Sequence, residues 1–376
     1  MSSGGVGHGD LTGKGRTGNV PRQLRAHPLP KHDYRCTQDD RQPPPIPHSR
    51  VPPDRTQRLW YTFLVSLIEA IPNISEGKRT GIIEAFTVAV CSPADVELLN
   101  QSSDAAHNRT VFTLVGTPAG LTNALVALYD VALRTIDLKT HRGEHPRIGA
   151  VDVVPLVPLA PRDMPLCVTT ATALAETIAS QFDVPVYLYA DAATRQNRHR
   201  LEQIRSGEFE GLSSKMSQPA WRPDFGPTSP HPSAGASVIG ARRPLVAFNV
   251  NLETGDLDIA KRIARTVRES SGGLPAVKAI GIRTRDPSVV QISINLVDYR
   301  RTPLHVVFDA VRDEASRLGT NVRSSELIGL APAEALHAAA THRLHLEGVT
   351  TDQVLEYRLR HCPDPKRLQP NDKNET

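Results

Sequence analysis

The stretch LVAFNVNLETGDLDIAKRIARTV, residues 245–267, contains the two patterns on which the fold depends. Apolar and polar residues alternate in its first part, which predicts a strand over residues 245–251. Its second part places Ile259 and Ile263 on one face of a helix over residues 257–268. A strand followed by an amphipathic helix is the beginning of a layered unit of helices on a sheet.

The residues that follow complete a β-α-β-β-α-β order. Short β-rich runs cover residues 277–283 and 289–297, a helical pattern covers 304–318, and residues 321–330 supply the last strand. This order is that of a ferredoxin-like layer, in which helices cover one face of a sheet.

The same order occurs earlier in the chain. The predicted strands cover residues 64–71, 96–100, 110–115 and 150–157. One predicted helix starts near Arg79 and a second covers 118–137. A further helix over 166–182 and a strand over 184–189 extend this half of the chain. We therefore expect an α/β (α+β) protein built from two ferredoxin-like subdomains. Residues 205–243, between the two units, are rich in Pro, Gly and Ser, and we expect an irregular, functional connection there.

Four segments follow from this pattern. They are a basic, Pro-rich tail (1–58), an N-terminal subdomain (59–241), a C-terminal subdomain (242–345) and a C-terminal extension (346–376). Residues 1–55 contain nine prolines and a net charge of +4, whereas the rest of the chain is neutral. A segment that buries little apolar surface does not repay its ordering entropy, so we expect the N-terminal tail to be disordered.

Composition excludes several classes of protein. No apolar run approaches the roughly 20 residues that a membrane span needs, and the first residues lack the apolar stretch of a secretory signal. The four cysteines form no CxxC pair, which indicates free thiols in a reducing compartment and predicts a cytoplasmic protein. A neutral body argues against a nucleic-acid partner but leaves room for a local basic pocket that binds a small anion.

The segment HRGEHPRIGAVDVVPLVPL, residues 141–159, is the most informative polar cluster. Its pattern predicts a loop that leads into a buried strand. Side chains of such a loop lie at one end of the sheet. Gly143 and Pro146 break any helix, so His141 and His145 are not a metal pair four residues apart. His145 is the natural general base, because histidine titrates near neutrality, although a structural loop histidine is the alternative.

Three further segments are candidates for binding. DAAHNRT (104–110) contains Arg109, which is suited to holding a carboxylate through two hydrogen bonds. PNISEGK (72–78) lacks the glycines of a phosphate loop and predicts a strand-to-helix turn, or a helix N-terminus that accepts a carboxylate. DFGPTSPHPSAGASVIGAR (224–242) predicts a fixed loop whose backbone can approach a flat ligand. An ordinary structural role is the alternative for each segment.

Taken together, these segments resemble the glutamate formimidoyltransferase family, the folate-dependent enzyme of histidine degradation. The resemblance runs from about Leu64 to Ala340 and includes, in one order, IPNISEGK, HNRTVFTLVG, IDLKTHRGEHPRIGAVDVVP, VPVYLYADAA, IRSGEFEGL, WRPDFGP, GARRPLVAFNVNL, QISINLVDYRRTPLHVVF and SELIGLAP. The chain resembles the monofunctional form, without the cyclodeaminase domain of bifunctional relatives.

The resemblance implies transfer of a formimidoyl group between N5 of tetrahydrofolate and the amino group of L-glutamate, with tetrahydrofolate as co-substrate and no metal. It implies that His145 is the catalytic residue and that two subdomains form a folate-binding crevice in a cytoplasmic homodimer with no membrane or nucleic-acid partner. It places folate contacts on Gly226, Pro227, Thr228, Ser229, Pro230, His231, Pro232, Ser233, Ala234 and Gly235.

The charged neighbours of His145 suit the anionic substrates that the resemblance implies. Arg109, Arg147 and Asn108 are candidates to contact a carboxylate or the tetrahedral intermediate. Three alternatives stay open: transfer of a formyl group or use of another amine on the same scaffold, a non-catalytic folate-binding protein, and an RNA-binding module. The last requires an aromatic and basic strand, and the predicted C-terminal strands 245–251 and 289–297 contain only Phe248.

Overall fold

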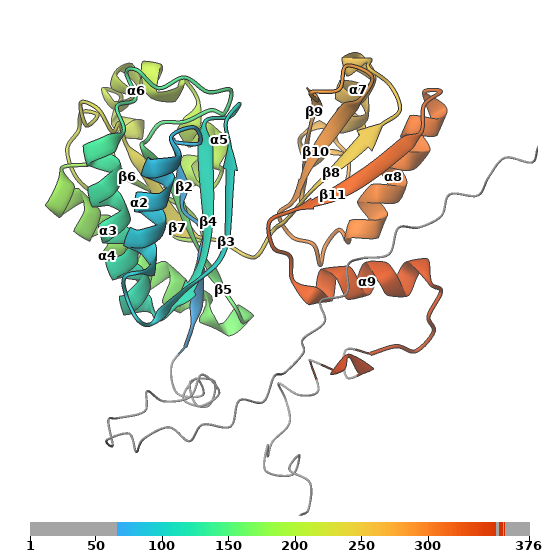
Figure 1. Cartoon of the computed structure of the whole chain (residues 1–376), viewed down its shortest axis with the longest axis horizontal. Coiled ribbons are helices and arrows are strands. Elements are labelled where there is room, and N and C mark those ends of the chain that lie inside the picture. The colour runs from blue at the N-terminus through green and yellow to red at the C-terminus, as the bar shows by residue number, and fades with distance from the viewer. Residues whose placement is uncertain (1–65, 351–352, 356, 358–376) are drawn as a thin grey trace, which may run out of the picture. The chain divides into compact units, whose positions relative to one another are not determined.

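The structure, a computed structural model, describes residues 66–350, 353–355 and 357. The predicted tail 1–58 and the greater part of 346–376 lie outside the described residues. The described residues contain a seven-stranded sheet and a four-stranded sheet, each with its own helices and its own apolar core (Figure 1). Each unit is described in turn.

The N-terminal unit contains the predicted β-α-β-β-α-β order. Its elements are β1 (Ile68–Ala70), β2 (Asn73–Ile74), α2 (Thr80–Cys91), β3 (Val96–Asp104), β4 (Arg109–Gly116), α3 (Pro118–Thr135) and β5 (Val151–Pro158). Strand β4 pairs with β3 on one side and with β1 and β2 on the other, and β5 pairs with β1 and β2, all antiparallel. This is the strand order of a ferredoxin-like sheet, so the predicted fold class is confirmed.

The first strand is shorter than predicted and is interrupted. The sequence predicted one strand over residues 64–71, whereas the structure shows β1 and then β2 after a break at Pro72. Proline has no N–H to donate to a sheet, so the ladder is interrupted there. The backbone still runs through the sheet, because Ile71 N donates to Pro155 O at 3.0 Å and Phe112 N donates to Pro72 O at 3.1 Å.

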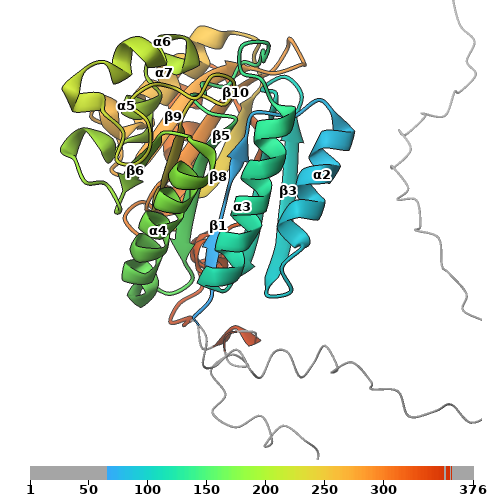
Figure 2. The same cartoon turned by 90° about the vertical axis from the view of Figure 1, so that its left-hand side faces the viewer.

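Helices cover one face of this sheet. Helices α2, α3 and α4 (Met164–Phe182) lie side by side over the strands (Figure 2). Leu121, Leu125 and Leu128 recur on one face of α3 and are fully buried against the strands. Thr117 caps the same helix, because its side chain accepts the N–H of Gly120. Packing and capping therefore both agree with the predicted helix over residues 118–137.

The prediction of an irregular stretch over residues 205–243 is wrong in part. The structure shows α6 (Glu208–Met216), a 3₁₀ helix (Pro219–Trp221) and β7 (Ser237–Ala241). Strand β7 lies between β5 and β6 (Val186–Ala190) and is parallel to both. Its five residues, SVIGA, contain a glycine and follow a Pro- and Gly-rich loop, so they lack the period of a longer strand.

The second face of the N-terminal sheet is covered where β5, β7 and β6 lie. Every residue of β5 is buried, as expected for a strand packed on both faces. On this face Tyr187 and Tyr189 pack with Ile204 of α5 (Leu201–Arg205) and with residues of α6. The short helices α5 and α6 therefore position a second, smaller core next to the loops described below.

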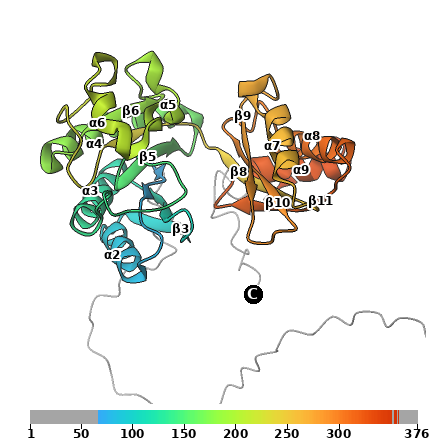
Figure 3. The ribbon, with the colours of Figure 1, turned by 90° about the horizontal axis from the view of Figure 1, so that it is seen from above.

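The C-terminal unit is a second ferredoxin-like layer. It contains β8 (Val246–Leu252), α7 (Leu257–Val267), β9 (Val277–Arg283), β10 (Val290–Leu296), α8 (Leu304–Arg317) and β11 (Val322–Ile328). The strands are antiparallel in the order β11-β8-β10-β9. Helices α7 and α8 bury their apolar residues against one face (Figure 3). The predicted elements differ from these bounds by only one or two residues.

A helix that the sequence did not predict follows the last strand. Helix α9 (Ala333–Arg343) packs on α8, and its Glu334 accepts hydrogen bonds from Tyr299 and Arg300. Its apolar residues are mostly alanines that surround the helix, so the sequence lacks the one-sided pattern of an amphipathic helix. Among the described residues, every helix is too short or too polar to cross a membrane.

Candidate active site

Three of the four candidate segments meet at one end of the N-terminal sheet. The turn from β2 to α2, the hairpin between β3 and β4, and the loop before β5 lie there, because Ile74 is paired with both Thr110 and Val151. These connections contain the strings PNISEGK, DAAHNRT and HRGEHPR. Segments that are 30 to 70 residues apart in sequence therefore form one cluster, which we call the loop cluster.

Two glycines allow these loops to pack in direct contact. A Cβ atom on Gly77 would lie 2.4 Å from the carbonyl oxygen of Asp104, and one on Gly143 would lie 2.3 Å from that of His107. Such distances are far below van der Waals contact, so any larger residue would separate the loops. The glycines of SEGK and HRGEHPR therefore allow the backbones of neighbouring loops to lie in direct contact.

Asn108 links all three loops. Its Oδ1 accepts the N–H of Gly77 at 2.9 Å, and its Nδ2 donates to the carbonyl of Arg142 at 3.0 Å. Its backbone has a φ of +48°, in the left-handed region that asparagine tolerates better than most residues. The side chain is buried and both ends of its amide are occupied by backbone groups. The structure thus places Asn108 as the residue that positions the cluster.

The turn from β2 to α2 is confirmed as a strand-to-helix connection. The start of α2 already has an anionic partner, because the buried carboxylate of Glu76 accepts the backbone N–H groups of Lys78 and Arg79. Hydrogen bonds from these groups and the side chain of Arg79 hold the pKa of Glu76 below its usual range against the desolvation that raises it. The helix N-terminus is therefore occupied by the chain's own carboxylate.

His145 is partly buried in the loop cluster. Its Nε2 contacts the guanidinium of Arg109, and its ring lies edge-on to that of His107, with centroids 6.3 Å apart. Burial, followed by the positive charges of Arg109 and Arg205, lowers the pKa of His145 to about 3. The imidazole is therefore neutral at pH 7. Because an arginine only donates, Nε2 is the acceptor and the proton is assigned to Nδ1.

Arg109 is the closest charged neighbour of His145. Within the described residues it makes no ion pair with a carboxylate, and its guanidinium is directed at the imidazole. Burial, together with the nearby charge of Arg205, lowers the pKa of Arg109 to about 10, while Asp152 and Asp104 raise it. At neutral pH Arg109 is still a cation.

Arg205 and Asp152 complete the charged part of the site, and the sequence analysis did not single out either residue. Asp152 is buried at the start of β5, where it accepts the N–H of Ile148 at 2.7 Å and pairs with Arg205 from the end of α5. A lone aspartate inside the apolar run VDVVPLVPL was the available signal, because a buried carboxylate requires a partner.

Arg147 and His141 have structural partners. The Arg147 guanidinium binds Glu208 and Glu210 of α6, and its Nε lies 3.3 Å from Nδ1 of His141. His141 is buried, with its Nε2 3.0 Å from the carbonyl oxygen of Asn108, and burial lowers its pKa. Both side chains therefore join the loop cluster to α6.

The fourth segment, the loop over residues 226–235, lies beside the loop before β5. The backbone N–H groups of Leu138 and Ala150 donate to Ser233 and Ala234 at 2.8 and 2.9 Å. Gly235 has a φ of +72°, and a Cβ atom there would lie 2.1 Å from the carbonyl oxygen of Ile148. The loop is therefore fixed to the residues that follow His145.

The two ends of this loop differ in exposure. Thr228, Ser229 and Pro232 are exposed, whereas Ala234 and Gly235 are buried. The predicted folate residues thus divide into an exposed tip and an anchor that packs against the protein.

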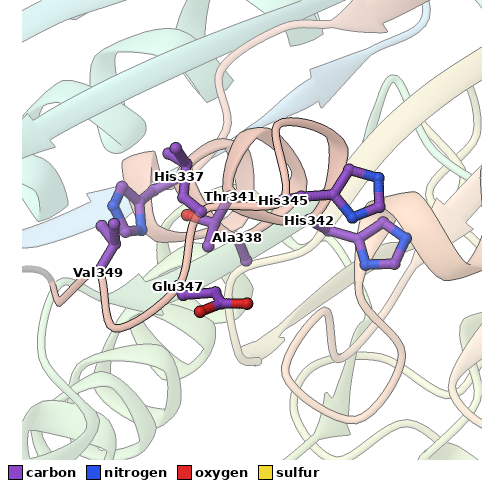
Figure 4. Close-up of a pocket in the computed structure, with 8 residues that line it drawn as sticks. His337, Ala338, Thr341, His342, His345, Glu347 and Val349 are labelled. Atoms are coloured by element: carbon purple, nitrogen blue, oxygen red, sulfur yellow. The ribbon is translucent and has the colours of Figure 1, made fainter.

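A separate pocket lies beside α9 in the C-terminal unit. His337, His342, His345 and Glu347 are among its lining residues (Figure 4). None of the candidate residues of the sequence analysis lines it. Across the described part of the chain, no group of three or more His, Cys, Asp or Glu side chains is arranged to hold a metal ion.

Comparisons with known proteins agree with this arrangement. Residues 67–242 match the model of the formiminotransferase domain, N-terminal subdomain, and residues 247–357 match that of the formiminotransferase domain. The chain is 43% identical over 297 residues to a glutamate formimidoyltransferase of Streptococcus pyogenes serotype M1, covering 79% of this chain and 99% of that protein.

Two further relatives have a similar level of identity. A glutamate formimidoyltransferase of Thermoplasma acidophilum is 41% identical, over 78% of this chain and 98% of that protein. The formimidoyltransferase-cyclodeaminase of Rattus norvegicus is also 41% identical, over 73% of this chain but only 52% of that protein. The two domain matches, together with relatives of full length, show that this chain belongs to the formiminotransferase family.

Proposed function

We propose that this protein is a glutamate formimidoyltransferase. It transfers a formimidoyl group between N5 of tetrahydrofolate and the amino group of L-glutamate, a reaction of histidine degradation and one-carbon folate metabolism. The observation that carries this proposal is the loop cluster, which lies beside the anchored loop over residues 226–235. In it the neutral His145 lies against Arg109, which makes no ion pair with a carboxylate within the part of the chain that the structure describes. The base is His145, the arginine is a site for an anion, and the loop over residues 226–235 offers backbone that a flat ligand can contact.

The proposed chemistry is a proton transfer between two nitrogens. An ammonium group is not a nucleophile, so the glutamate nitrogen must lose a proton before it attacks the formimidoyl carbon. His145 accepts that proton, and the freed amine then forms the new C–N bond. His145 returns the proton to N5 of the folate as the C–N5 bond breaks. The reverse reaction uses the same steps in reverse order. The neutral state of His145 supports this role.

We propose that the exposed tip of the 226–235 loop contacts the folate. Its glycines and prolines fix the backbone, and its anchor at Gly235 packs against the residues that follow His145. The loop is hydrogen-bonded to Leu138 and Ala150, on either side of His145 in the sequence, and this contact supports a pterin site near the imidazole. The loop therefore contributes affinity for folate, while His145 contributes the chemical step.

We propose that Arg109 binds a carboxylate of the glutamate substrate. The guanidinium presents several donors in one plane and makes no ion pair with a carboxylate among the described residues. Asn108 and Arg147 were candidates for the same task, but their donors are already bound to backbone carbonyls and to Glu208 and Glu210. We therefore assign these two residues to positioning the loops.

The remaining expectations stay predictions. A homodimer and a folate-binding crevice between the two subdomains are implied by the family resemblance. The cytoplasm is the expected location from the unpaired cysteines. Proton transfer between two nitrogen atoms does not require a metal ion.

A steady-state assay tests the proposed function. Purified protein is mixed with 5-formimidoyltetrahydrofolate and L-glutamate, and release of tetrahydrofolate is followed. A parallel reaction with 5-formyltetrahydrofolate examines formyl transfer on the same scaffold. We expect turnover with the formimidoyl donor only. Folate binding without turnover of either donor would favour a non-catalytic binding protein, and faster turnover of the formyl donor would reassign the substrate.

A further inference from the structure

The charges around His145 are not balanced. Arg109 and Arg205 both face the imidazole closely enough to lower its pKa, and His107 adds a smaller effect. Among the described residues, the buried carboxylate of Asp152 is bound to Arg205, and Asp104 accepts hydrogen bonds from the backbone of its own turn. A partly buried guanidinium that makes no ion pair with any described carboxylate is therefore present beside the base.

The same guanidinium blocks the atom that the reaction requires. His145 acts as a base through the lone pair of Nε2, because Nδ1 bears the proton. Arg109 donates to that lone pair in this structure. An imidazole in this state is neutral, but it is a weak base and its acceptor site is occupied. His145 is therefore inactive until Arg109 moves.

We propose that Arg109 couples binding of the substrate carboxylate to activation of His145, because the carboxylate draws the guanidinium away from Nε2. The proposal rests on the assignment of His145 as the proton-transfer group. A carboxylate is a stronger acceptor for a guanidinium than a neutral imidazole is, because both partners are then charged and the planar guanidinium can form two parallel hydrogen bonds with it. The exchange frees the lone pair and neutralises the closest positive charge at the same time. Both changes increase the basicity of His145.

The largest charge effects on His145 act in one direction in the absence of substrate. Arg109 from the β3–β4 hairpin, Arg205 from α5 and His107 from the hairpin turn each lower its pKa, and a hydrogen bond with the backbone of Pro146 raises it. Arg205 remains paired with Asp152 after the exchange. Arg109 is thus the one member of this group that is without an ion pair in the described residues and can respond to a ligand carboxylate.

Coupling of this kind differs from simple carboxylate binding. If Arg109 only holds the carboxylate, its removal raises the KM for glutamate and leaves the titration of His145 unchanged. If Arg109 also restrains the base, its removal additionally raises the pKa of His145 in the absence of substrate. The second effect is a readout that a purely structural role would not produce.

The experiment is a histidine titration by NMR on the full chain labelled with ¹³C at the histidine Cε1 positions. The His145 signal is assigned from its absence in His145→Gln. Spectra are recorded from pH 4.5 to 8.5 for the free protein and for a complex with L-glutamate and tetrahydrofolate, which contains no formimidoyl group and does not react. Wild type, Arg109→Gln and the control Arg162→Gln are compared. Arg162 is exposed near the opposite end of β5.

In the free wild type we expect His145 to remain neutral down to the lowest pH of the series, because its pKa is lowered to about 3. In the complex we expect its titration to enter the series. In Arg109→Gln the titration is within the series already without substrate, and glutamate changes it little. Arg162→Gln behaves as wild type. A His145 signal that does not titrate within the series in the wild-type complex, or in free Arg109→Gln, overturns the proposal. These titrations do not depend on turnover, so failure of the coupling is distinguishable from failure of the proposed function, which the activity of His145→Ala reveals.

Discussion

The two ferredoxin-like units of this chain share their order of elements but differ in the second face of the sheet. In the C-terminal unit, β8 alternates between buried and partly exposed residues, and polar side chains line the second face. There Gln291 donates to Asn251 and to Glu326, and Asn249 also donates to Glu326. In the N-terminal unit, β5 is buried throughout, because β7, β6, α5 and α6 extend and cover the sheet.

The loops that connect strands and helices also differ between the two units. The β9–β10 connection of the C-terminal unit bonds largely within its own turn, through Thr284 and Asp286. It also has an ion pair with Arg323 of β11 and a close approach, where a Cβ atom on Gly255 would lie 2.2 Å from the carbonyl oxygen of Pro287. The connections of the N-terminal unit bond to each other across long stretches of sequence, through Asn108 and through the close approach at Gly77 and Gly143. The common topology therefore supplies a scaffold, and the chemistry lies where several connections are forced together.

The largest effect that separates the two units is expected from histidine replacements. His145→Ala removes the proposed proton-transfer group, so kcat is expected to fall by about 10²–10⁴-fold, the usual value of general acid–base catalysis, while folate affinity is retained. His337→Ala, in the pocket of the C-terminal unit, is the matched control and should keep normal turnover. A smaller loss for His145→Ala than for His337→Ala would place the chemistry in the other unit. His141→Ala is an unsuitable control, because His141 is buried and hydrogen-bonded.

Replacement of arginines gives the next largest contrast. Arg109→Gln removes the carboxylate ligand, and the loss of a charge-assisted hydrogen bond of about 1.5–3 kcal/mol predicts a rise of roughly 10- to 100-fold in the KM for glutamate. His145 must be neutral to accept a proton, and loss of the positive charge raises its pKa in the free enzyme, so the acid limb of kcat/KM moves to higher pH. Arg323→Gln, an exposed arginine paired with Asp286 in the C-terminal unit, should change neither quantity. Initial rates over a pH series measure both, and an unchanged KM would remove Arg109 from substrate binding.

Glycine substitutions examine how tightly the N-terminal loops are packed. Gly143→Ala places a methyl group against the carbonyl of His107, and overpacking of this kind costs about 1–3 kcal/mol of the free energy of unfolding. Gly81→Ala, in the first turns of α2, points into open space and is expected to be neutral or to stabilise by up to about 1 kcal/mol. Urea titrations followed by circular dichroism give both values. Equal stabilities would show that the loops separate without cost.

The smallest effect is expected at the tip of the 226–235 loop. Thr228→Ala and Ser229→Ala remove exposed hydroxyls, and each neutral hydrogen bond to the folate contributes about 0.5–1.5 kcal/mol, so the KM for the donor should rise by roughly 2- to 10-fold with kcat unchanged. Ser316→Ala on α8 is the control. A change in the KM for glutamate instead of the donor would assign the loop to the other substrate. Valine at Gly235 is less informative, because it disrupts the anchor itself.

The sequence predicted the two repeated layers because long amphipathic helices and alternating strands have clear periods. It did not predict β7 or α9, since a five-residue parallel strand with a glycine and an alanine-rich helix have weak patterns. His145 and the loop over residues 226–235 were predicted as site residues because they lie in sequence motifs that resemble those of the family. Arg205 and Asp152 were missed because their pairing depends on which residues the fold brings together, 53 positions apart in sequence.

The central claim is that His145 of the loop cluster transfers the proton, and chemical rescue tests it most directly. Release of tetrahydrofolate by His145→Ala is measured at saturating substrates with increasing imidazole, which supplies the missing group in solution. We predict that imidazole raises the rate of His145→Ala in a concentration-dependent manner and leaves wild type unchanged. A folded His145→Ala protein that turns over at the wild-type rate without imidazole would contradict the account.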